Sequence, residues 1–154
     1  MKILIIYDSV YGNTEKIAFA VGEAIGPEAT VKKVSEAKVK DLEDIGLLIL
    51  GTPTHGGRPT PAMQDFLKMI PDGELKNAKV AAFDTRFNEK KASAFLRLLA
   101  KILNFAAPRI ARNLKIKGVE MAIEPEGFIV EGKEGPLKQG EMERAEEWAK
   151  KLRN

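Results

Sequence analysis

The amino-acid sequence predicts an α/β fold with three layers, in which a doubly wound parallel sheet of five strands, in the order 2-1-3-4-5, lies between helices. Short apolar runs alternate with longer amphipathic stretches along the chain, the pattern of successive βαβ units. Residues 3–7 (ILIIY) are apolar throughout, as expected of a strand buried on both faces of a sheet. Three of these runs are followed directly by loops with small polar residues. In an open parallel sheet such loops meet at the carboxyl edge of the strands, where ligands bind.

The elements of the first half follow from periodicity and from helix-breaking residues. A helix is expected over 13–25, because Ile17, Ala18 and Val21 share one face and Gly26-Pro27 ends the pattern. The other elements expected here are strands over 3–7, 30–34 and 46–50, a short helical turn over 39–44, and a helix over 61–70.

The second half continues the alternation. The last helix, over 139–152, is acidic at its start and basic at its end, as the helix dipole favours, and Trp148 is expected in the core. The remaining elements are a strand over 80–83, an apolar helix over 92–103, a helix over 107–117 with Pro108 in its first turn, and strand pieces over 119–123 and 128–130. The 154 residues contain no repeat or linker, so we expect a single domain over 1–154.

Composition excludes several classes of function. The chain has 25 Lys and Arg against 22 Asp and Glu, a net charge of +3, without the basic stripe of a nucleic-acid binder. There is no cysteine, which excludes disulfides, thiol catalysis and iron–sulfur clusters held by this chain. His55 is the only histidine, so a multi-histidine metal site is excluded. No apolar run approaches the ~20 residues of a membrane span or forms a signal peptide, and we expect a cytoplasmic protein without a membrane association.

The three loops are residues 9–14 (SVYGNT), 51–59 (GTPTHGGRP) and 84–87 (DTRF). The first precedes a helix, whose unpaired N–H groups and partial positive charge favour an anion. The hydroxyls of Ser9 and Thr14 would add donors, Gly12 would let the backbone approach closely, and the loop itself has no Lys or Arg. The residues alone leave two interpretations open: a neutral cradle for a phosphate monoester, or only a helix cap and a turn.

Other phosphate-binding motifs are absent. The chain has neither G-x-x-x-x-G-K-[ST] nor G-x-G-x-x-G, so neither a P-loop nor a Rossmann dinucleotide site is supported. A receiver domain would need an acceptor aspartate after the third strand, where this chain has Gly51-Thr52. We find no residues that form a catalytic or metal-ligating constellation.

At this point the motifs resemble a known family. YDSVYGNTEKIA resembles the phosphate loop of flavodoxins and of the flavodoxin domains of flavodiiron proteins, and GTPTHGGRP resembles their second flavin loop. The tail from Gly127 to Leu152 resembles the split fifth strand and last helix of small flavodoxin-like proteins, so the resemblance covers the whole chain. It implies non-covalently bound FMN and electron transfer between redox protein partners, such as a reductase or ferredoxin-like donor and an acceptor.

The resemblance also implies a role for each loop. His55 takes a place often held by a stacking aromatic, and Tyr11 stands where Thr or Ser is usual. The third loop lacks the tyrosine that commonly covers the ring, and Phe87 would stand in for it. The peptide between Gly56 and Gly57 would flip to present a carbonyl to N5–H of the reduced flavin. The implied flavin-binding residues are Ser9, Val10, Tyr11, Gly12, Asn13 and Thr14 in the first loop, Pro53, Thr54, His55, Gly56 and Gly57 in the second, and Asp84, Thr85, Arg86 and Phe87 in the third.

Three functions follow from this resemblance. The first is an electron carrier, favoured by the short loops; the second is an FMN-dependent NAD(P)H:quinone oxidoreductase; the third is a flavin-free interaction module of the same fold. Arg58 and Arg86 would make the final reduction potential less negative if they lie near the ring, or would be solvated rim residues. The positive net charge favours an acidic partner.

Overall fold

The computed structural model describes residues 1–87 and 105–154, so the helix expected over 92–103 lies outside the described residues. The strands form one parallel sheet in the order β2-β1-β3-β4-β5, with β6 also paired to β4, and this confirms the predicted topology. Their bounds are β1 Lys2–Tyr7, β2 Ala29–Lys33, β3 Ile45–Pro53, β4 Lys79–Phe87, β5 Glu120–Met121 and β6 Glu126–Val130.

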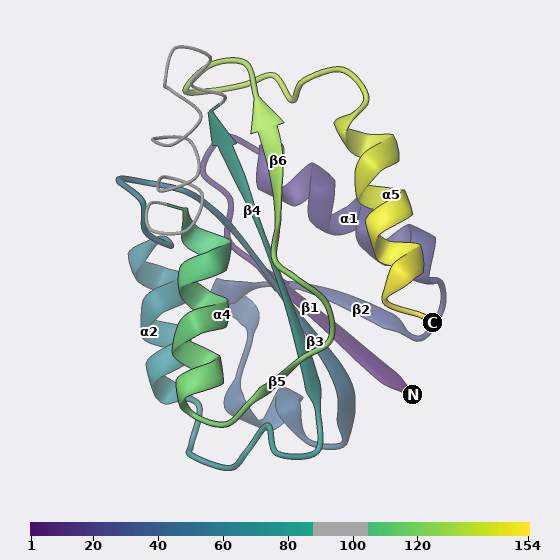
Figure 1. The fold of residues 1–154 in the computed structure, drawn as a ribbon, viewed down its shortest axis with the longest axis vertical. Helices are drawn as coiled ribbons and strands as arrows, with labels where there is room; N and C mark the ends of the chain where they lie inside the picture. Colours follow the sequence, from purple (N-terminus) through teal and green to yellow (C-terminus); the bar gives the residue numbers. More distant parts are fainter. Residues whose placement is uncertain (88–104) are drawn as a thin grey trace.

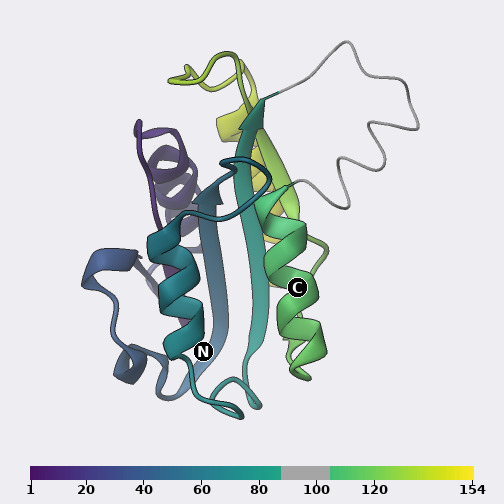
Figure 2. The same ribbon diagram turned by 90° about the vertical axis from the view of Figure 1, so that its left-hand side faces the viewer.

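Helices cover both faces of the sheet (Figures 1 and 2). One layer contains α1 (Asn13–Ile25) and α5 (Glu141–Lys151), which lie against each other. The other contains α2 (Pro61–Met69) and α4 (Ala106–Ile116), together with the 3-10 turns η1 (Val34–Glu36) and η2 (Val39–Leu42). The bounds of α1 agree with the prediction at both ends, because Gly12 and Gly26 flank a continuous helical pattern.

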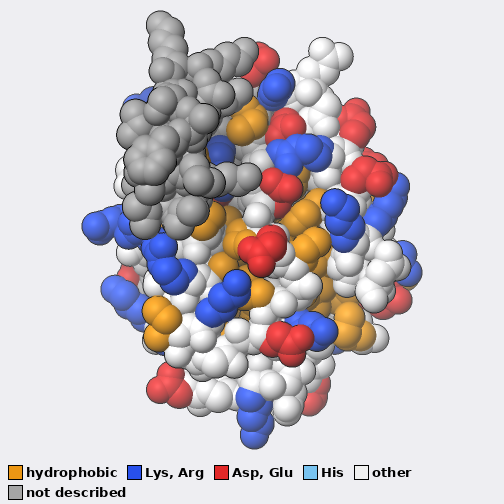
Figure 3. Space-filling model, in the orientation of Figure 1, with side chains coloured by type: hydrophobic (Ala, Val, Ile, Leu, Met, Phe, Trp, Pro, Cys, Tyr) orange, Lys and Arg blue, Asp and Glu red, His pale blue; other side chains and the backbone are white. Residues whose placement is uncertain are grey.

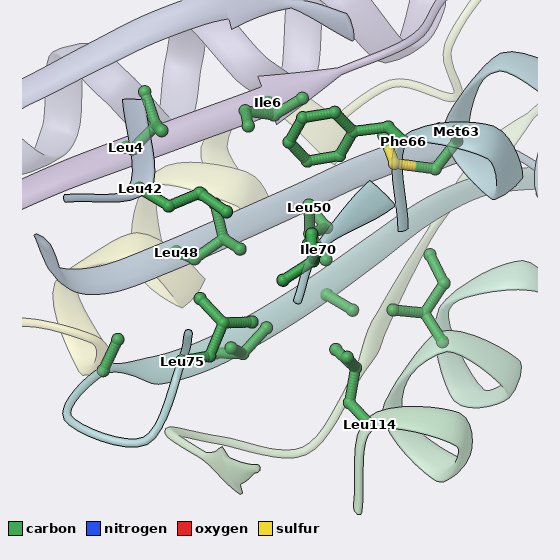
Figure 4. Packing of buried hydrophobic residues seen from close by; sticks show 14 of the residues in the cluster. Leu4, Ile6, Leu42, Leu48, Leu50, Met63, Phe66, Ile70, Leu75 and Leu114 are labelled. Carbon is green, nitrogen blue, oxygen red and sulfur yellow. The ribbon is translucent and has the colours of Figure 1, made fainter. Parts of the chain in front are cut away.

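Each face of the sheet has its own apolar core. Figure 4 shows the core beneath α2 and α4, where the ring of Phe66 of α2 lies next to Ile6 of β1 and Leu114 of α4 lies at the opposite side of the cluster. On the opposite face Trp148 is buried, as predicted, and its ring contacts the edges of Phe83 and Phe128 at centroid distances of 6.0 and 6.3 Å. The sheet is therefore enclosed on both sides, which explains why its central strands β1 and β3 contain continuous apolar runs.

The fifth position of the sheet is occupied by two short strands. β5 pairs with Lys79 and Val80 at the beginning of β4, and β6 pairs with Phe83–Phe87 at its end (Figure 1). This confirms the split fifth strand that the resemblance implied. It also places the carboxyl end of β6 beside the carboxyl end of β4.

The segment Asp84–Phe87 is strand rather than the loop that was expected. β4 continues to Phe87, because Thr52 and Pro53 of β3 pair with Asp84 and Thr85 while β6 pairs along the other side. The sequence did not predict this extension, because polar residues are uncommon in a strand that is buried in the middle of a sheet. In the structure Asp84 and Arg86 form an ion pair, so both polar side chains can be buried in this strand.

Candidate functional site

A cleft of about 560 Å³ opens at the carboxyl edge of the sheet. All three predicted segments reach it, and a fourth segment, which follows β6, joins them. Its lining residues are Ser9, Val10, Tyr11, Asn13, Thr14, Pro53, Thr54, His55, Gly56, Thr85, Arg86, Phe87, Val130 and Lys133. Gly12, Gly57 and Asp84, which were also predicted, are not part of this lining.

The first loop is held by its own serine. Gly12 adopts a left-handed conformation (φ +91°) directly before α1, a backbone that other residues rarely accept. The Oγ of Ser9 accepts hydrogen bonds from the N–H groups of Gly12 (3.1 Å) and Glu15 (3.3 Å). Ser9 therefore shapes the loop as an acceptor, and its own hydroxyl proton stays available for a further contact.

The other N–H groups of this loop find no acceptor in the part of the chain that the structure describes. Among the described residues, nothing accepts a hydrogen bond from the backbone N–H of Val10, Tyr11, Asn13 or Thr14. Unpaired N–H groups at the start of a 13-residue helix give this end of the cleft a positive electrostatic potential. The loop can therefore bind an anion without any cationic side chain of its own.

Asp8 anchors the loop to the neighbouring helix. Its Oδ1 accepts the N–H of Ser9 at 2.9 Å, and its Oδ2 accepts the hydroxyl of Thr60 at 2.5 Å. Thr60 in turn caps α2 by accepting the N–H of Met63 at 3.3 Å. Asp8 therefore fixes the loop relative to α2.

Two threonines from distant parts of the chain meet in the wall of the cleft. Thr14 on α1 and Thr85 on β4 share a hydrogen bond of 2.8 Å between their hydroxyls, and both side chains are buried. Thr14 therefore connects the first predicted loop to the end of β4. Its hydroxyl has one partner already, so it can contribute at most its remaining donor or lone pair to a ligand.

The second loop is a tight hairpin. His55 and Arg58 exchange two backbone hydrogen bonds of 2.9 and 3.0 Å, and the two glycines between them both have positive φ, +56° and +75°. Positive φ at both central positions is typical of a two-residue type I′ turn. His55 and Gly56 face the cleft, and His55 is exposed, whereas Arg58 lines a different groove.

The third segment contains a buried ion pair. Nε and Nη2 of Arg86 donate to Oδ1 and Oδ2 of Asp84 at 2.6 and 2.7 Å, and Asp84 also accepts the N–H of Ala107 at the start of α4. Arg86 lies over the ring of Phe105, 3.7 Å from its centroid. Burial raises the pKa of the Asp84 carboxyl, and Arg86 and the Ala107 N–H act against that rise.

The burial of this pair bears on two expectations. Asp84 is fully buried behind the cleft rather than in its lining, and Arg86 is only 9% exposed, so it is not a solvated rim residue. The charge of Arg86 is balanced by its partner, so it presents little net positive charge to the cleft. Phe87, by contrast, lines the cleft with its ring about half exposed.

Sequence reasoning missed Val130 and Lys133. Val130 is the last residue of β6, and Lys133 follows that strand. Lys133 brings a cation to the cleft although it lies 119 positions after Thr14 in the sequence. The Nδ2 of Asn13 donates to the carbonyl of Glu134 at 3.1 Å, which ties this segment to the start of α1. The only signal was topological: β6 ends at the same edge as β1, β3 and β4, so the residues after it reach the same cleft.

Neither a metal cluster nor a membrane-spanning helix is found within residues 1–87 and 105–154. No three His, Cys, Asp or Glu side chains gather there in a way that could hold a metal ion. In the same residues, no helix has the length and the apolar character needed to cross a bilayer.

Comparison with known proteins shows a consistent family pattern. The sequence profile described as Flavodoxin matches residues 5–148. Flavodoxin 1 from Salmonella typhimurium is 30% identical over 107 residues, which cover 68% of this chain and 61% of that protein. An NAD(P)H dehydrogenase (quinone) from Methylocella silvestris is 34% identical over 89 residues, which cover 43% of this chain and 45% of that protein. The chain thus spans about half to three fifths of these relatives.

Solved structures share the fold along nearly the whole chain. Flavodoxin 2 from Bacillus cereus superposes with a TM-score of 0.76 at 21% identity and covers 99% of this chain and 98% of its own. A flavodiiron protein from Giardia intestinalis superposes with a TM-score of 0.71 at 17% identity, with 98% of this chain matched to 36% of that one. At these identities the superpositions show the fold alone.

Proposed function

Since this chain belongs to the flavodoxin family, we propose that it binds FMN in the cleft and carries electrons between redox protein partners. The observation that supports this most directly is the first loop. It presents unpaired N–H groups at the start of α1, within a cleft whose volume suits a cofactor.

The residues present fit the two ends of FMN. The loop from Ser9 to Thr14 would hold the phosphate with backbone N–H groups, and Lys133 would balance its charge. Pro53, Thr54 and His55 on one side and Phe87 on the other supply the apolar and aromatic surface that a planar ring system requires. When bound, the flavin supplies the redox chemistry, and the protein orients it and tunes its surroundings.

The hairpin at Gly56 and Gly57 would adapt to the flavin. Because both central residues are glycine, the peptide between them can rotate between a type I′ and a type II′ turn without a side-chain conflict. The reciprocal hydrogen bonds between His55 and Arg58 frame the turn and would persist through that rotation. The hairpin would in this way reorient one carbonyl toward the ring while its ends stay fixed.

A comparison of FMN with riboflavin tests the proposal. The purified chain, incubated with either compound and passed through gel filtration, should retain visible flavin absorbance only with FMN. Riboflavin lacks the phosphate, and the loss of charge-assisted hydrogen bonds of about 1.5–3 kcal/mol each should weaken it by roughly 100-fold or more. A chain that retains neither compound would contradict the proposal and would favour the flavin-free interaction module. Equal retention of both would mean that the loop is only a helix cap.

A second function is supported by the relative from Methylocella silvestris, whose name is that of an NAD(P)H-dependent quinone dehydrogenase. The FMN-loaded chain, mixed with NADH or NADPH and a soluble benzoquinone, distinguishes the two. An electron carrier should oxidise the nucleotide no faster than free FMN does. Rapid quinone turnover would establish the enzyme in place of the carrier.

A further inference from the structure

A second groove lies on the surface between α2 and α4. Its volume is about 410 Å³, and none of the described residues lines both this groove and the cleft. Its lining residues are Arg58, Pro59, Gln64, Leu67, Lys68, Arg109, Ile110, Asn113, Leu114, Ile116 and Lys117. The family function described above makes no use of this groove.

The groove has an apolar floor. Ile110 and Leu114 of α4 are buried below it, and Leu67 of α2 is half-buried on the opposite wall. Ile116, at the end of α4, is 80% exposed, an unusual state for an isoleucine beside an apolar groove. Removal of this apolar surface from water would favour association with a protein that fits the groove.

The rim of the groove is positively charged. Of the described lining residues four are Arg or Lys and none is Asp or Glu, and α4 contains no acidic residue. Within the described part of the chain, no salt bridge joins Arg58, Lys68 or Lys117 to a carboxylate. Figure 3 shows Lys and Arg side chains gathered over α2 and α4. Clustered charges above a low-dielectric floor attract a ligand or protein of opposite sign.

One hairpin forms part of both the cleft and the groove. His55 and Gly56 line the cleft, whereas Arg58 lines the groove, and reciprocal backbone hydrogen bonds hold His55 to Arg58. A protein seated on Arg58 would therefore contact the same hairpin that contributes His55 and Gly56 to the lining of the cleft. The groove is placed to position a partner beside the flavin.

We propose that this groove is the docking site for an acidic redox protein, a proposal that rests on the carrier function above. Carboxylates of the partner would pair with Arg58, Lys68 and Lys117, and an apolar side chain between them would enter the groove against Leu67 and Leu114. Charge would bring the partner to this face, and the apolar contact would retain it. The cleft remains free for the flavin, because the two sites have no lining residue in common within the described part of the chain.

The test uses the ¹⁵N-labelled chain and an acidic [2Fe–2S] ferredoxin as the probe, at low ionic strength. The paramagnetic cluster should broaden the amide signals of Arg58, residues 64–68 and residues 109–117. The double variant K68E/K117E should weaken binding about tenfold or more, because both cations become repulsive. The matched control is K151E/R153E, which makes the same change in net charge at the end of α5, on the opposite layer.

Three results would overturn the proposal. These are no binding of the ferredoxin at low ionic strength, broadening confined to another face, and equal weakening by K68E/K117E and K151E/R153E. Binding is read here from amide signals, whereas flavin retention is read from absorbance. A chain that fails to hold FMN would thus refute the carrier function without being mistaken for a failure of the groove.

Discussion

Asp84 and Arg86, two residues apart on β4, form a bidentate ion pair in which both partners are buried. Side chains at i and i+2 of a strand point to the same face, so this spacing lets the guanidinium lie directly on the carboxylate. The pair makes it possible for a polar stretch to continue a central strand up to the edge of the cofactor cleft.

Replacement of Arg86 by methionine should lower the free energy of unfolding by about 3–5 kcal/mol, because it leaves a buried carboxylate without its partner. Urea denaturation at neutral pH measures this change. The double variant D84N/R86M removes the charge as well and should recover most of the loss. If R86M is as stable as the parent chain, the buried carboxylate of Asp84 does not depend on Arg86 as its partner.

Replacement of Gly12 should weaken FMN binding, whereas replacement of Gly140, which has the same backbone conformation, should not. Gly12 and Gly140 precede α1 and α5 with the same φ of +91°, and an added Cβ would meet nothing within 4 Å at either position. G12A and G140A should therefore cost similar stability, about 1 kcal/mol. Only G12A should weaken FMN, as followed by quenching of flavin fluorescence. Equal FMN affinity in both variants would contradict the assignment of the phosphate to residues 9–14.

Lys133 should strengthen FMN binding through its charge. K133Q should weaken FMN about three- to tenfold at low ionic strength, and the difference should shrink with added salt, because an exposed cation is screened. K138Q is the matched control, since Lys138 is an exposed residue of the same segment outside the cleft lining. Riboflavin should bind both variants equally. A loss of affinity that is independent of salt would point to a structural effect instead.

Thr14 and Thr85 should show strong energetic coupling. T14V or T85V alone leaves a buried hydroxyl without its partner and should cost about 1–3 kcal/mol, while the double variant should cost less than the sum of the two. Thermal or urea unfolding of the four proteins gives the coupling energy. Strict additivity would mean that the 2.8 Å contact contributes nothing to stability.

Tyr7 should make stability fall at alkaline pH. Burial and the hydrogen bond to Glu15 raise the pKa of Tyr7 from 10.0 to about 12. Between these values the folded chain binds more protons than the unfolded chain. This contribution, about 2–3 kcal/mol, is complete below pH 10.0 and is lost as the pH rises to about 12. Y7F should be less sensitive to pH in this range. Parallel stability curves for the two proteins would contradict the raised pKa.

Much of the fold could be predicted because its signals are local. The apolar run at residues 3–7 and the helix at 13–25 need no distant information, and their alternation fixes the topology. The first loop was identified for the same reason, because the apolar strand, the turn with Gly12 and the start of the helix follow one another directly in the sequence. Gly12 itself shapes that loop without lining the cleft.

The remainder depended on contacts between residues far apart in the sequence. Asp84 and Arg86 are close in sequence, but their burial depends on β3 and β6, which pair with β4 on both sides, and the polarity of this segment alone suggested a loop. Lys133 reaches the cleft only because β6 pairs with the end of β4. The separation of Arg58 from the cleft depends on a tight turn, whose geometry decides the side on which each of its residues lies.

The split strand at the margin of the sheet also affects how copies of this chain meet each other. An exposed sheet edge with a long row of free N–H and C=O groups can pair with a neighbouring molecule and begin an aggregate. Here that edge is interrupted between β5 and β6, and it carries the carboxylates of Glu120 and Glu126. The opposite edge strand, β2, ends in Lys32 and Lys33. Interruption on one side and charge on both protect the sheet from growing by strand addition.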